Sequence, residues 1–201
     1  MSYDATTKNV VLFGGVNAAG ELAKLGDTWT WDGVAKTWTQ QSPSASPSPR
    51  LTPLAYDPAT QSVMLFGGGI EHPPGSGGSA FGDTWSWNGT TWTQQFPVTS
   101  PSARLGAGLA YDSGLGALVL FGGAVGGNWV NSADDTWTWN GTIWTQIFPA
   151  NVPSNRYYFG LSYNPIAKAL VMFGGFSTAA VPARSAGDGR EPRRVRDGPH
   201  G

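Results

Sequence analysis

The chain has 201 residues, and glycine (29), proline (15) and tryptophan (10) are abundant, whereas Asp, Glu, Lys and Arg together make up only 12%. The absence of cysteine excludes disulfides, thiolate metal sites, iron–sulfur clusters and cysteine nucleophiles. The net charge is −1, and the chain without its last eighteen residues holds seven Lys and Arg against ten Asp and Glu. This mildly acidic balance argues against nucleic-acid binding, and no apolar run reaches the length of about eighteen residues that a membrane span requires.

Short apolar segments that end in a Gly-Gly doublet recur along the chain, and each is preceded by a Tyr-Asp or Tyr-Asn pair. The doublets are Gly14-Gly15, Gly67-Gly68, Gly122-Gly123 and Gly174-Gly175. Their first glycines lie 53, 55 and 52 residues apart. A period of this length predicts a repeated supersecondary unit. Within it the apolar segment is a buried strand, and the doublet allows a bend and a close backbone approach.

A second block, Asp-Thr-Trp-x-Trp, follows each of the first three doublets. Its aspartates are Asp27, Asp83 and Asp135, and its first tryptophans are Trp29, Trp85 and Trp137. A further tryptophan follows at Trp38, Trp92 and Trp144, and an arginine opens the next unit at Arg50, Arg104 and Arg156. Because side chains two residues apart share a face of a strand, the tryptophans of one unit should gather on one face.

The Asn88-Gly89 pair between two tryptophan segments predicts a two-residue hairpin turn of type I′. Such a turn places Trp85 opposite Trp92 on the neighbouring strand. By the same logic Trp137 faces Trp144 and, across a turn longer by two residues, Trp29 faces Trp38. An isolated sheet could not bury so much indole, so we expect the tryptophans to form the core between neighbouring sheets rather than a ligand platform.

Together these recurring features resemble the kelch repeat, and the resemblance covers residues 3–176. It implies four antiparallel strands per repeat, with each repeat forming one blade of a β-propeller. The expected blades span about 1–50, 51–104 and 105–156, and a partial blade spans 157–176. The histidine often found after the leading arginine of a kelch repeat is replaced here by Pro53, Ala107 and Phe159.

The number of repeats is too small for a closed propeller, which has about four to eight blades. The first unit lacks its leading arginine, and no Asp-Thr-Trp block follows Phe176. We therefore expect an all-β, kelch-type propeller of about three to four four-stranded blades in an incomplete ring. Such a segment is either a fragment of a longer propeller or a unit that completes the ring by self-association.

The charged residues that recur in phase are expected to have structural roles, since catalytic groups are normally unique. We expect Arg50, Arg104 and Arg156 to form ion pairs with the recurring aspartates or to cap loop carbonyls. Three arginines that converge on an axis could instead bind a carboxylate, as they do in sialidase propellers. Their equivalent positions in the repeats favour the structural role.

Residues 177–201 differ from the repeats, because they contain five arginines and no aromatic residue. Three hypotheses account for this segment. It is a disordered tail, a spurious translation after a lost reading frame, or a basic tail that binds nucleic acid.

The sequence shows no constellation of catalytic residues or metal ligands, and its only histidines are His72 and His200. The copper chemistry of galactose oxidase, the enzyme to consider among kelch-like propellers, depends on a cysteine and on histidine ligands that this chain lacks. We therefore expect a non-catalytic protein-interaction or scaffold module without metal or cofactor. The alternatives are a secreted or surface glycan-binding module, favoured by the Trp, Asn and Gly content, and a fragment of a propeller enzyme.

Binding residues are expected in the segments that vary between repeats, because variable loops on a rigid scaffold commonly carry recognition. These segments are 16–25, 69–81 and 124–133, with the links 42–49, 97–102 and 149–155. Trp129 lies outside the repeated tryptophan positions and is the leading contact candidate, with loop packing as its alternative role. Further candidates are Asn128, Asn131, Glu71 and His72. The style of the repeats resembles that of exported bacterial kelch proteins, which favours an extracellular or periplasmic location.

Overall fold

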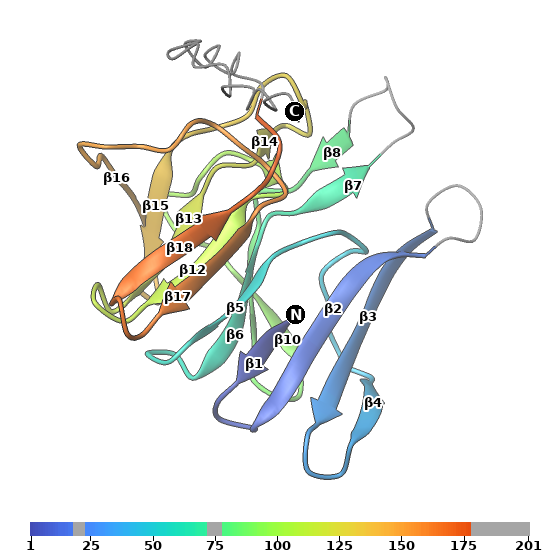
Figure 1. The fold of residues 1–201 in the computed structure, drawn as a ribbon. Helices are drawn as coiled ribbons and strands as arrows, with labels where there is room; N and C mark the ends of the chain where they lie inside the picture. The colour runs from blue at the N-terminus through green and yellow to red at the C-terminus, as the bar shows by residue number, and fades with distance from the viewer. Residues whose placement is uncertain (18–22, 72–77, 178–201) are drawn as a thin grey trace, which may run out of the picture.

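The computed structural model of the protein describes residues 1–17, 23–71 and 78–177. These residues form strands joined by turns and loops, and each strand runs antiparallel to its partners (Figure 1). The expectation of an all-β fold is confirmed, and the described strands form several open sheets rather than a closed barrel. No helix in this part of the chain has the length and apolarity needed to cross a bilayer. The Arg-rich segment from residue 178 onward lies outside the described residues.

Three four-stranded sheets share one arrangement, in which the strands are hydrogen-bonded in the order first, second, third, fourth. Sheet 1 contains β1 (Ser2–Asp4), β2 (Asn9–Asn17), β3 (Ala23–Asp32) and β4 (Thr37–Gln41). Sheet 2 contains β5 (Leu54–Asp57), β6 (Ser62–Phe66), β9 (Thr84–Trp87) and β10 (Trp92–Gln95). Sheet 3 contains β12 (Gly108–Asp112), β13 (Ala117–Phe121), β15 (Thr136–Trp139) and β16 (Trp144–Ile147).

Sheet 4 contains only β17 (Gly160–Asn164) and β18 (Ala169–Phe173) among the described residues. Two short two-stranded ribbons each include at least one strand that follows a Gly-Gly doublet. One pairs β7 (Gly69–Glu71) with β8 (Gly78–Ala80), and the other pairs β11 (Arg104–Leu105) with β14 (Ala124–Val125). The first strands of the four sheets contact one another in chain order, so the sheets follow one another side by side (Figure 1).

The tryptophan hairpins have a different register from the predicted one. Trp87, and not Trp85, lies opposite Trp92, and Trp139, and not Trp137, lies opposite Trp144. Sheet 1 shows the same difference, since Trp38 lies opposite Trp31 rather than Trp29. The register differs from the prediction by two residues, an even number, so the tryptophans still lie on the predicted face.

In sheet 2 the reason for this register is the side chain of the asparagine in the turn. The Oδ1 atom of Asn88 accepts hydrogen bonds from the backbone N–H groups of Thr90 and Thr91, both at 3.0 Å. Gly89 has a positive φ of 97°, whereas Asn88 does not have the positive φ that a type I′ turn requires. The asparagine therefore closes an Asx-type loop over residues 88–91 instead of a two-residue turn.

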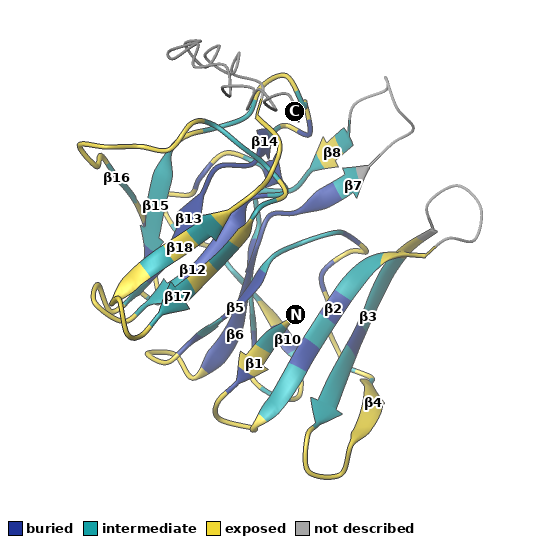
Figure 2. Cartoon of the chain, in the orientation of Figure 1, coloured by how far each residue is buried: buried dark blue, intermediate teal, exposed yellow. Residues whose placement is uncertain are grey.

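The core lies between neighbouring sheets, as the sequence predicts. One buried cluster joins Val11 and Phe13 of sheet 1 to Trp87 and Trp92 of sheet 2. The second joins sheet 2 to sheet 3 in the same way, and the ring of Phe66 packs edge-on against Trp144 at 5.1 Å. Figure 2 shows the result as a buried band through the middle strands, with exposed residues concentrated in β4, β18 and the turns.

The contact of sheet 1 with sheet 2 and that of sheet 2 with sheet 3 share a hydrogen bond from a buried tryptophan to a threonine. The indole Nε1 of Trp92 donates to Thr28 Oγ1 at 2.9 Å, and Nε1 of Trp144 donates to Thr84 Oγ1 at 3.0 Å. Both threonines are buried. Thr136 occupies the equivalent position in sheet 3, where sheet 4 offers no tryptophan, and it is only half-buried. Sheet 3 therefore has the same acceptor hydroxyl as sheets 1 and 2, although no tryptophan of sheet 4 donates to it.

Thr84→Val should lower the free energy of unfolding by about 1–3 kcal/mol, because it leaves the buried indole N–H of Trp144 without an acceptor. Thr136→Val is the matched control and should change stability by less than about 0.5 kcal/mol, since no indole donates to that hydroxyl. Urea unfolding followed by near-UV circular dichroism measures both. Equal effects of the two substitutions would contradict the role of this hydrogen bond.

Candidate functional site

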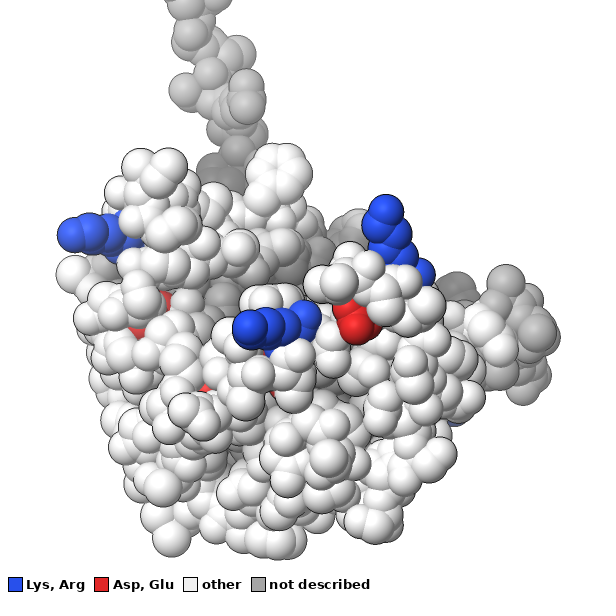
Figure 3. All heavy atoms as spheres, turned by 90° about the horizontal axis from the view of Figure 1, so that it is seen from below, with Lys and Arg blue, Asp and Glu red and all other residues white. Residues whose placement is uncertain are grey.

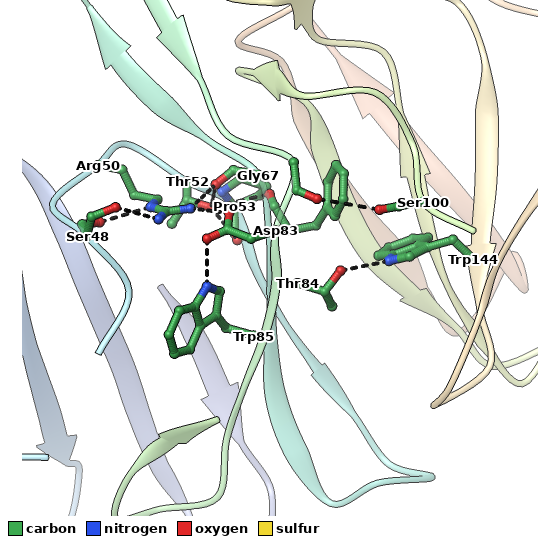
Figure 4. Close-up of polar contacts among 12 residues, drawn as sticks. Ser48, Arg50, Thr52, Pro53, Gly67, Asp83, Thr84, Trp85, Ser100 and Trp144 are labelled. Carbon is green, nitrogen blue, oxygen red and sulfur yellow. Dashed lines mark hydrogen bonds and ion pairs between the residues drawn. The ribbon is translucent and has the colours of Figure 1, made fainter. Parts of the chain in front are cut away.

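A buried arginine organises the loop end of sheet 2 and of sheet 3, and Figure 4 shows the group in sheet 2. Arg50 is 1% exposed, and its Nη1 donates to Asp83 Oδ1 at 2.5 Å and to the carbonyl of Gly67 at 3.1 Å. Its Nε and Nη2 donate to the carbonyl and hydroxyl of Ser48. The other oxygen of Asp83, Oδ2, accepts the indole N–H of Trp85 at 2.7 Å. Guanidinium, carboxylate and indole thus form one fully bonded group, which offsets the cost of burying the charges.

The same group recurs in sheet 3. Arg104 donates to Asp135 at 2.5 Å, to the carbonyl of Gly122 and to Ser102, while Trp137 donates to Asp135. The predicted pairing of the recurring arginines and aspartates is therefore present in sheets 2 and 3.

The two ends of the described chain hold half of this group each. Arg156 donates to Ser154 and to the carbonyl of Gly174, but no carboxylate of the described residues pairs with it. Asp27 accepts the indole N–H of Trp29 at 2.6 Å, and its other oxygen, Oδ1, is buried without a hydrogen-bond partner among those residues. In the complete groups the equivalent oxygen accepts the guanidinium.

The arginines also join neighbouring sheets through their backbones. The backbone N–H of Arg104 donates to Phe81 and its carbonyl accepts from Gly68, both in sheet 2, while its side chain belongs to sheet 3. The Gly-Gly doublet makes this approach feasible. Gly67 has a φ of 60°, and a Cβ added there would lie 2.8 Å from the carbonyl oxygen of Phe81. The predicted close backbone approach at the doublets is thus present at this position.

The acid–base properties of Asp135 follow from the same geometry. Burial raises the pKa of this carboxyl group, but hydrogen bonds from Arg104 and Trp137 outweigh that effect and hold the pKa below its ordinary value. The carboxylate is therefore kept ionised at neutral pH as a partner for the guanidinium.

The segments that directly follow the three arginines meet around one pocket of about 260 Å³. Its lining consists of Leu51, Thr52, Pro53, Gly106, Ala107, Tyr158 and Phe159. The lining is largely apolar, and its three parts occupy equivalent positions in successive repeats. Complete arginine groups anchor the first two segments, and the bonds of Arg156 to Ser154 and Gly174 anchor the third, so the pocket has a rigid base.

Tyr158 is the least expected residue of this pocket. Its φ is 55°, in the left-handed region that bulky side chains rarely adopt. The equivalent residue in sheet 3 is Gly106, with a φ of 69°, and the two backbones are joined by a hydrogen bond from Tyr158 N to Gly106 O at 2.8 Å. Backbone strain of this kind, about 1–3 kcal/mol, is often associated with functional positions. Tyr158 is 37% exposed and lines the pocket.

Trp129, the leading contact candidate from the sequence, is half-buried beside this pocket. Its ring lies 5.0 Å from that of Tyr157 and 5.7 Å from that of Tyr158, and Tyr157 stacks on Phe176. We call these four residues the aromatic cluster. Trp129 thus both packs against the loop and presents part of its ring at the surface.

The other candidate residues have less direct positions. The side chain of Asn128 accepts the backbone N–H of Val130, and the backbone of Asn131 bonds to Asn128 and Val125, so both asparagines shape the turn that carries Trp129. The backbone of Glu71 ends β7 and pairs with Gly78. His72 lies outside the described residues.

Charge contributes little at this site. In the described part of the chain no group of three or more His, Asp or Glu residues is placed to hold a metal ion. Figure 3 shows one face of the molecule on which lysine and arginine side chains are few and separated. What the site offers chemically is aromatic surface beside backbone polar groups.

Sequence reasoning missed the tyrosines and Phe159 as site residues. The signal was present, because residues 157–159 read Tyr-Tyr-Phe where the other repeats have Leu-Thr-Pro and Leu-Gly-Ala. A residue that departs from the repeat in this way is a candidate for a role other than maintaining the repeated fold.

No protein-family model matches the chain, and a search of curated proteins also finds no match.

Arg104→Gln should lower the free energy of unfolding by about 3–5 kcal/mol, because it leaves the partly buried carboxylate of Asp135 without its cation. Arg156→Gln is the comparison and should cost less, since that arginine has no carboxylate partner among the described residues. Urea unfolding at neutral pH measures the difference. If both substitutions lowered the free energy of unfolding equally, the bonds of the arginine to the carbonyl and the serine, and not the ion pair, would account for the loss of stability.

The lowered pKa of Asp135 predicts a loss of stability in acid. Because the folded-state pKa lies below the ordinary carboxyl value of 3.8, the stabilisation is complete above that value and disappears as the pH falls through the folded-state pKa. The difference in unfolding free energy between wild type and Asp135→Asn should therefore narrow as the pH is lowered below 3.8. Asp134→Asn, which removes an exposed carboxylate next to the arginine group, is the control variant.

Proposed function

We propose that this protein is a non-catalytic, kelch-type propeller segment that acts as a protein-interaction or scaffold module. Its recognition surface is the pocket after the three arginines together with the aromatic cluster. The observation that carries the proposal is the strained Tyr158, whose exposed ring is held beside Trp129 on a rigid base.

Several features support this assignment. The repeated four-stranded sheets, with their first strands side by side, are the arrangement that propeller blades would have. The buried charged groups of sheets 2 and 3 satisfy one another and hold the backbone in place. Aromatic residues are enriched where proteins bind partners, since they supply a large contact area at small entropic cost.

A glycan-binding module is the second candidate, and the aromatic cluster favours it. Exposed faces of Trp129 and Tyr158 could stack against sugar rings, while the asparagines of the adjoining turn could bond to hydroxyl groups. A glycan contact would be confined to these rings and asparagines, whereas a protein contact would extend over the neighbouring loops that carry β7, β8 and β14 (Figure 1).

The test combines Trp129→Ala with Tyr158→Gly and compares binding on protein and glycan arrays. Glycine is the residue found at the equivalent position 106, so Tyr158→Gly removes the ring and relieves the strained φ without disturbing the backbone. We expect ligands of the wild-type protein to bind the double variant at least about tenfold more weakly, a loss of about 1.4 kcal/mol.

Val34→Ser is the control, because it removes an apolar side chain that is 94% exposed in the distant β3–β4 turn. Protein ligands lost only in the double variant support the interaction module, and oligosaccharides lost in this way support the glycan-binding module. Ligands that bind wild type and the double variant equally would exclude the pocket as the recognition surface.

A further inference from the structure

Among the described residues, no strand covers the outer edge of β18, whereas the same edge is covered in sheets 1, 2 and 3. In sheets 1, 2 and 3 the second strand pairs on its outer side with an Asp-Thr-Trp-x-Trp strand, namely β3, β9 or β15. In the part of the chain that the structure describes, nothing pairs with β18 on that side. One face of β18 is exposed as well: Val171 is 51% exposed, whereas the equivalent Met64, which packs against sheet 3, is 2% exposed.

The register at this edge is the same in all three complete sheets. Phe13, Phe66 and Phe121 lie opposite a threonine, and the residue before each lies opposite the first tryptophan of the block. Phe173 is the equivalent residue of β18. A strand of the same kind would therefore place its threonine opposite Phe173, its first tryptophan opposite Met172 and its second opposite Leu170.

Arg156 is positioned to bind the aspartate of such a strand. Its guanidinium bonds to the carbonyl of Gly174 at 3.1 Å and to Ser154, as Arg104 bonds to Gly122 and Ser102. In sheets 2 and 3 the Nη1 atom of the arginine also holds the aspartate two residues before the first tryptophan. No carboxylate of the described residues pairs with Arg156. Its guanidinium therefore places a positive charge at this edge, where the aspartate of a partner strand would lie.

Sheet 3 offers a third point of contact, for the tryptophan on the returning strand of the hairpin. Phe13 and Thr28 receive Trp92 of the next sheet, and Phe66 and Thr84 receive Trp144. Phe121 and Thr136 are the equivalent pair of sheet 3, and β17 and β18 contain no tryptophan to meet them. The ring of Phe121 packs edge-on against Phe159 at 5.9 Å, so Thr136 is the member of the pair that a tryptophan would reach. Residues 178–201 contain no aromatic residue, so they cannot supply it either.

We propose that β18, Arg156 and Thr136 form a binding site for a β-hairpin of a partner polypeptide that carries Asp-Thr-Trp-x-Trp, a tight turn and a further tryptophan. The hairpin adds to sheet 4 in antiparallel orientation, its aspartate pairs with Arg156, and the indole N–H of its last tryptophan donates to Thr136. This site is separate from the aromatic cluster, and the proposal stands or falls independently of the proposed function.

A synthetic peptide with the sequence of Gly82–Gln95, labelled at its C-terminus, is the probe. Titration of the full chain into this peptide, followed by fluorescence anisotropy, should show saturable binding. Arg156→Gln should weaken the affinity at least about tenfold, and so should Asp83→Asn within the peptide. The two changes together should cost little more than either alone, because they remove the same ion pair.

Lys168→Gln is the matched charge control and should leave the affinity unchanged. It removes a positive charge from the turn of the same hairpin, and Gln61 already occupies the equivalent position of sheet 2 with nearly the same φ, 51° against 50°. A peptide of the same composition in scrambled order should not bind.

The register provides a second measurement, because the chain contains no cysteine. Met64 lies opposite Ser86 in sheet 2, so Val171→Cys should form a disulfide most readily with a peptide carrying Ser86→Cys. A peptide carrying Thr84→Cys tests a slip of two residues and should react less.

Three outcomes would overturn the proposal: no binding of the peptide, binding that is equal for the scrambled peptide, or affinity that Arg156→Gln and the peptide change Asp83→Asn both leave intact. If Arg156→Gln fails to fold, the peptide variant and the disulfide yields on the otherwise unchanged chain still decide between these outcomes.

Discussion

The structure depends on one arginine per repeat whose backbone belongs to one sheet and whose guanidinium belongs to the next. Removing this charge from water is unfavourable by several kcal/mol, and the arrangement is stable because the guanidinium donates to a carboxylate, a carbonyl and a serine at once. The carboxylate in turn accepts an indole N–H from the strand that forms the core. One residue thus fixes the position of the link, the end of the second strand and the start of the third. The Gly-Gly doublet is required because only glycine allows the three backbones to meet there.

The same interaction accounts for the position of the pocket. Each arginine fixes the position and direction of the backbone that follows it. Equivalent positions of three repeats therefore line one cavity. The side chains at these positions differ from repeat to repeat, although Ala107 also belongs to the core between sheets 2 and 3. Threonine, glycine and tyrosine occupy the same position in sheets 2, 3 and 4, and only the tyrosine brings an aromatic ring. Recognition would therefore depend on residues that the scaffold leaves free to vary.

The sequence predicted the sheets, their common face and the pairing of arginine with aspartate, because each follows from a short pattern repeated in phase. It did not predict the register of the tryptophan hairpins. A type I′ turn and an Asx loop both begin with Asn-Gly, and the side-chain bonds of Asn88 decide between them. The candidate site was predicted only in part. Trp129 was identified because it breaks the repeat, whereas Tyr157 and Tyr158 were not, since their approach to Trp129 requires two loops to meet in space.

The half-complete arginine groups make the two ends of the described chain unlike each other. Sheet 1 ends in a tryptophan face with an acidic oxygen, and sheet 4 ends in a phenylalanine face with a guanidinium. Two copies that met through these ends would therefore form a heterologous, head-to-tail contact rather than a two-fold one. Repetition of such a contact closes into a ring when the rotation between neighbours divides a full turn, and otherwise continues as a helical filament. The rotation from one sheet to the next, fixed by the arginine, thus determines the symmetry open to any assembly built through these ends.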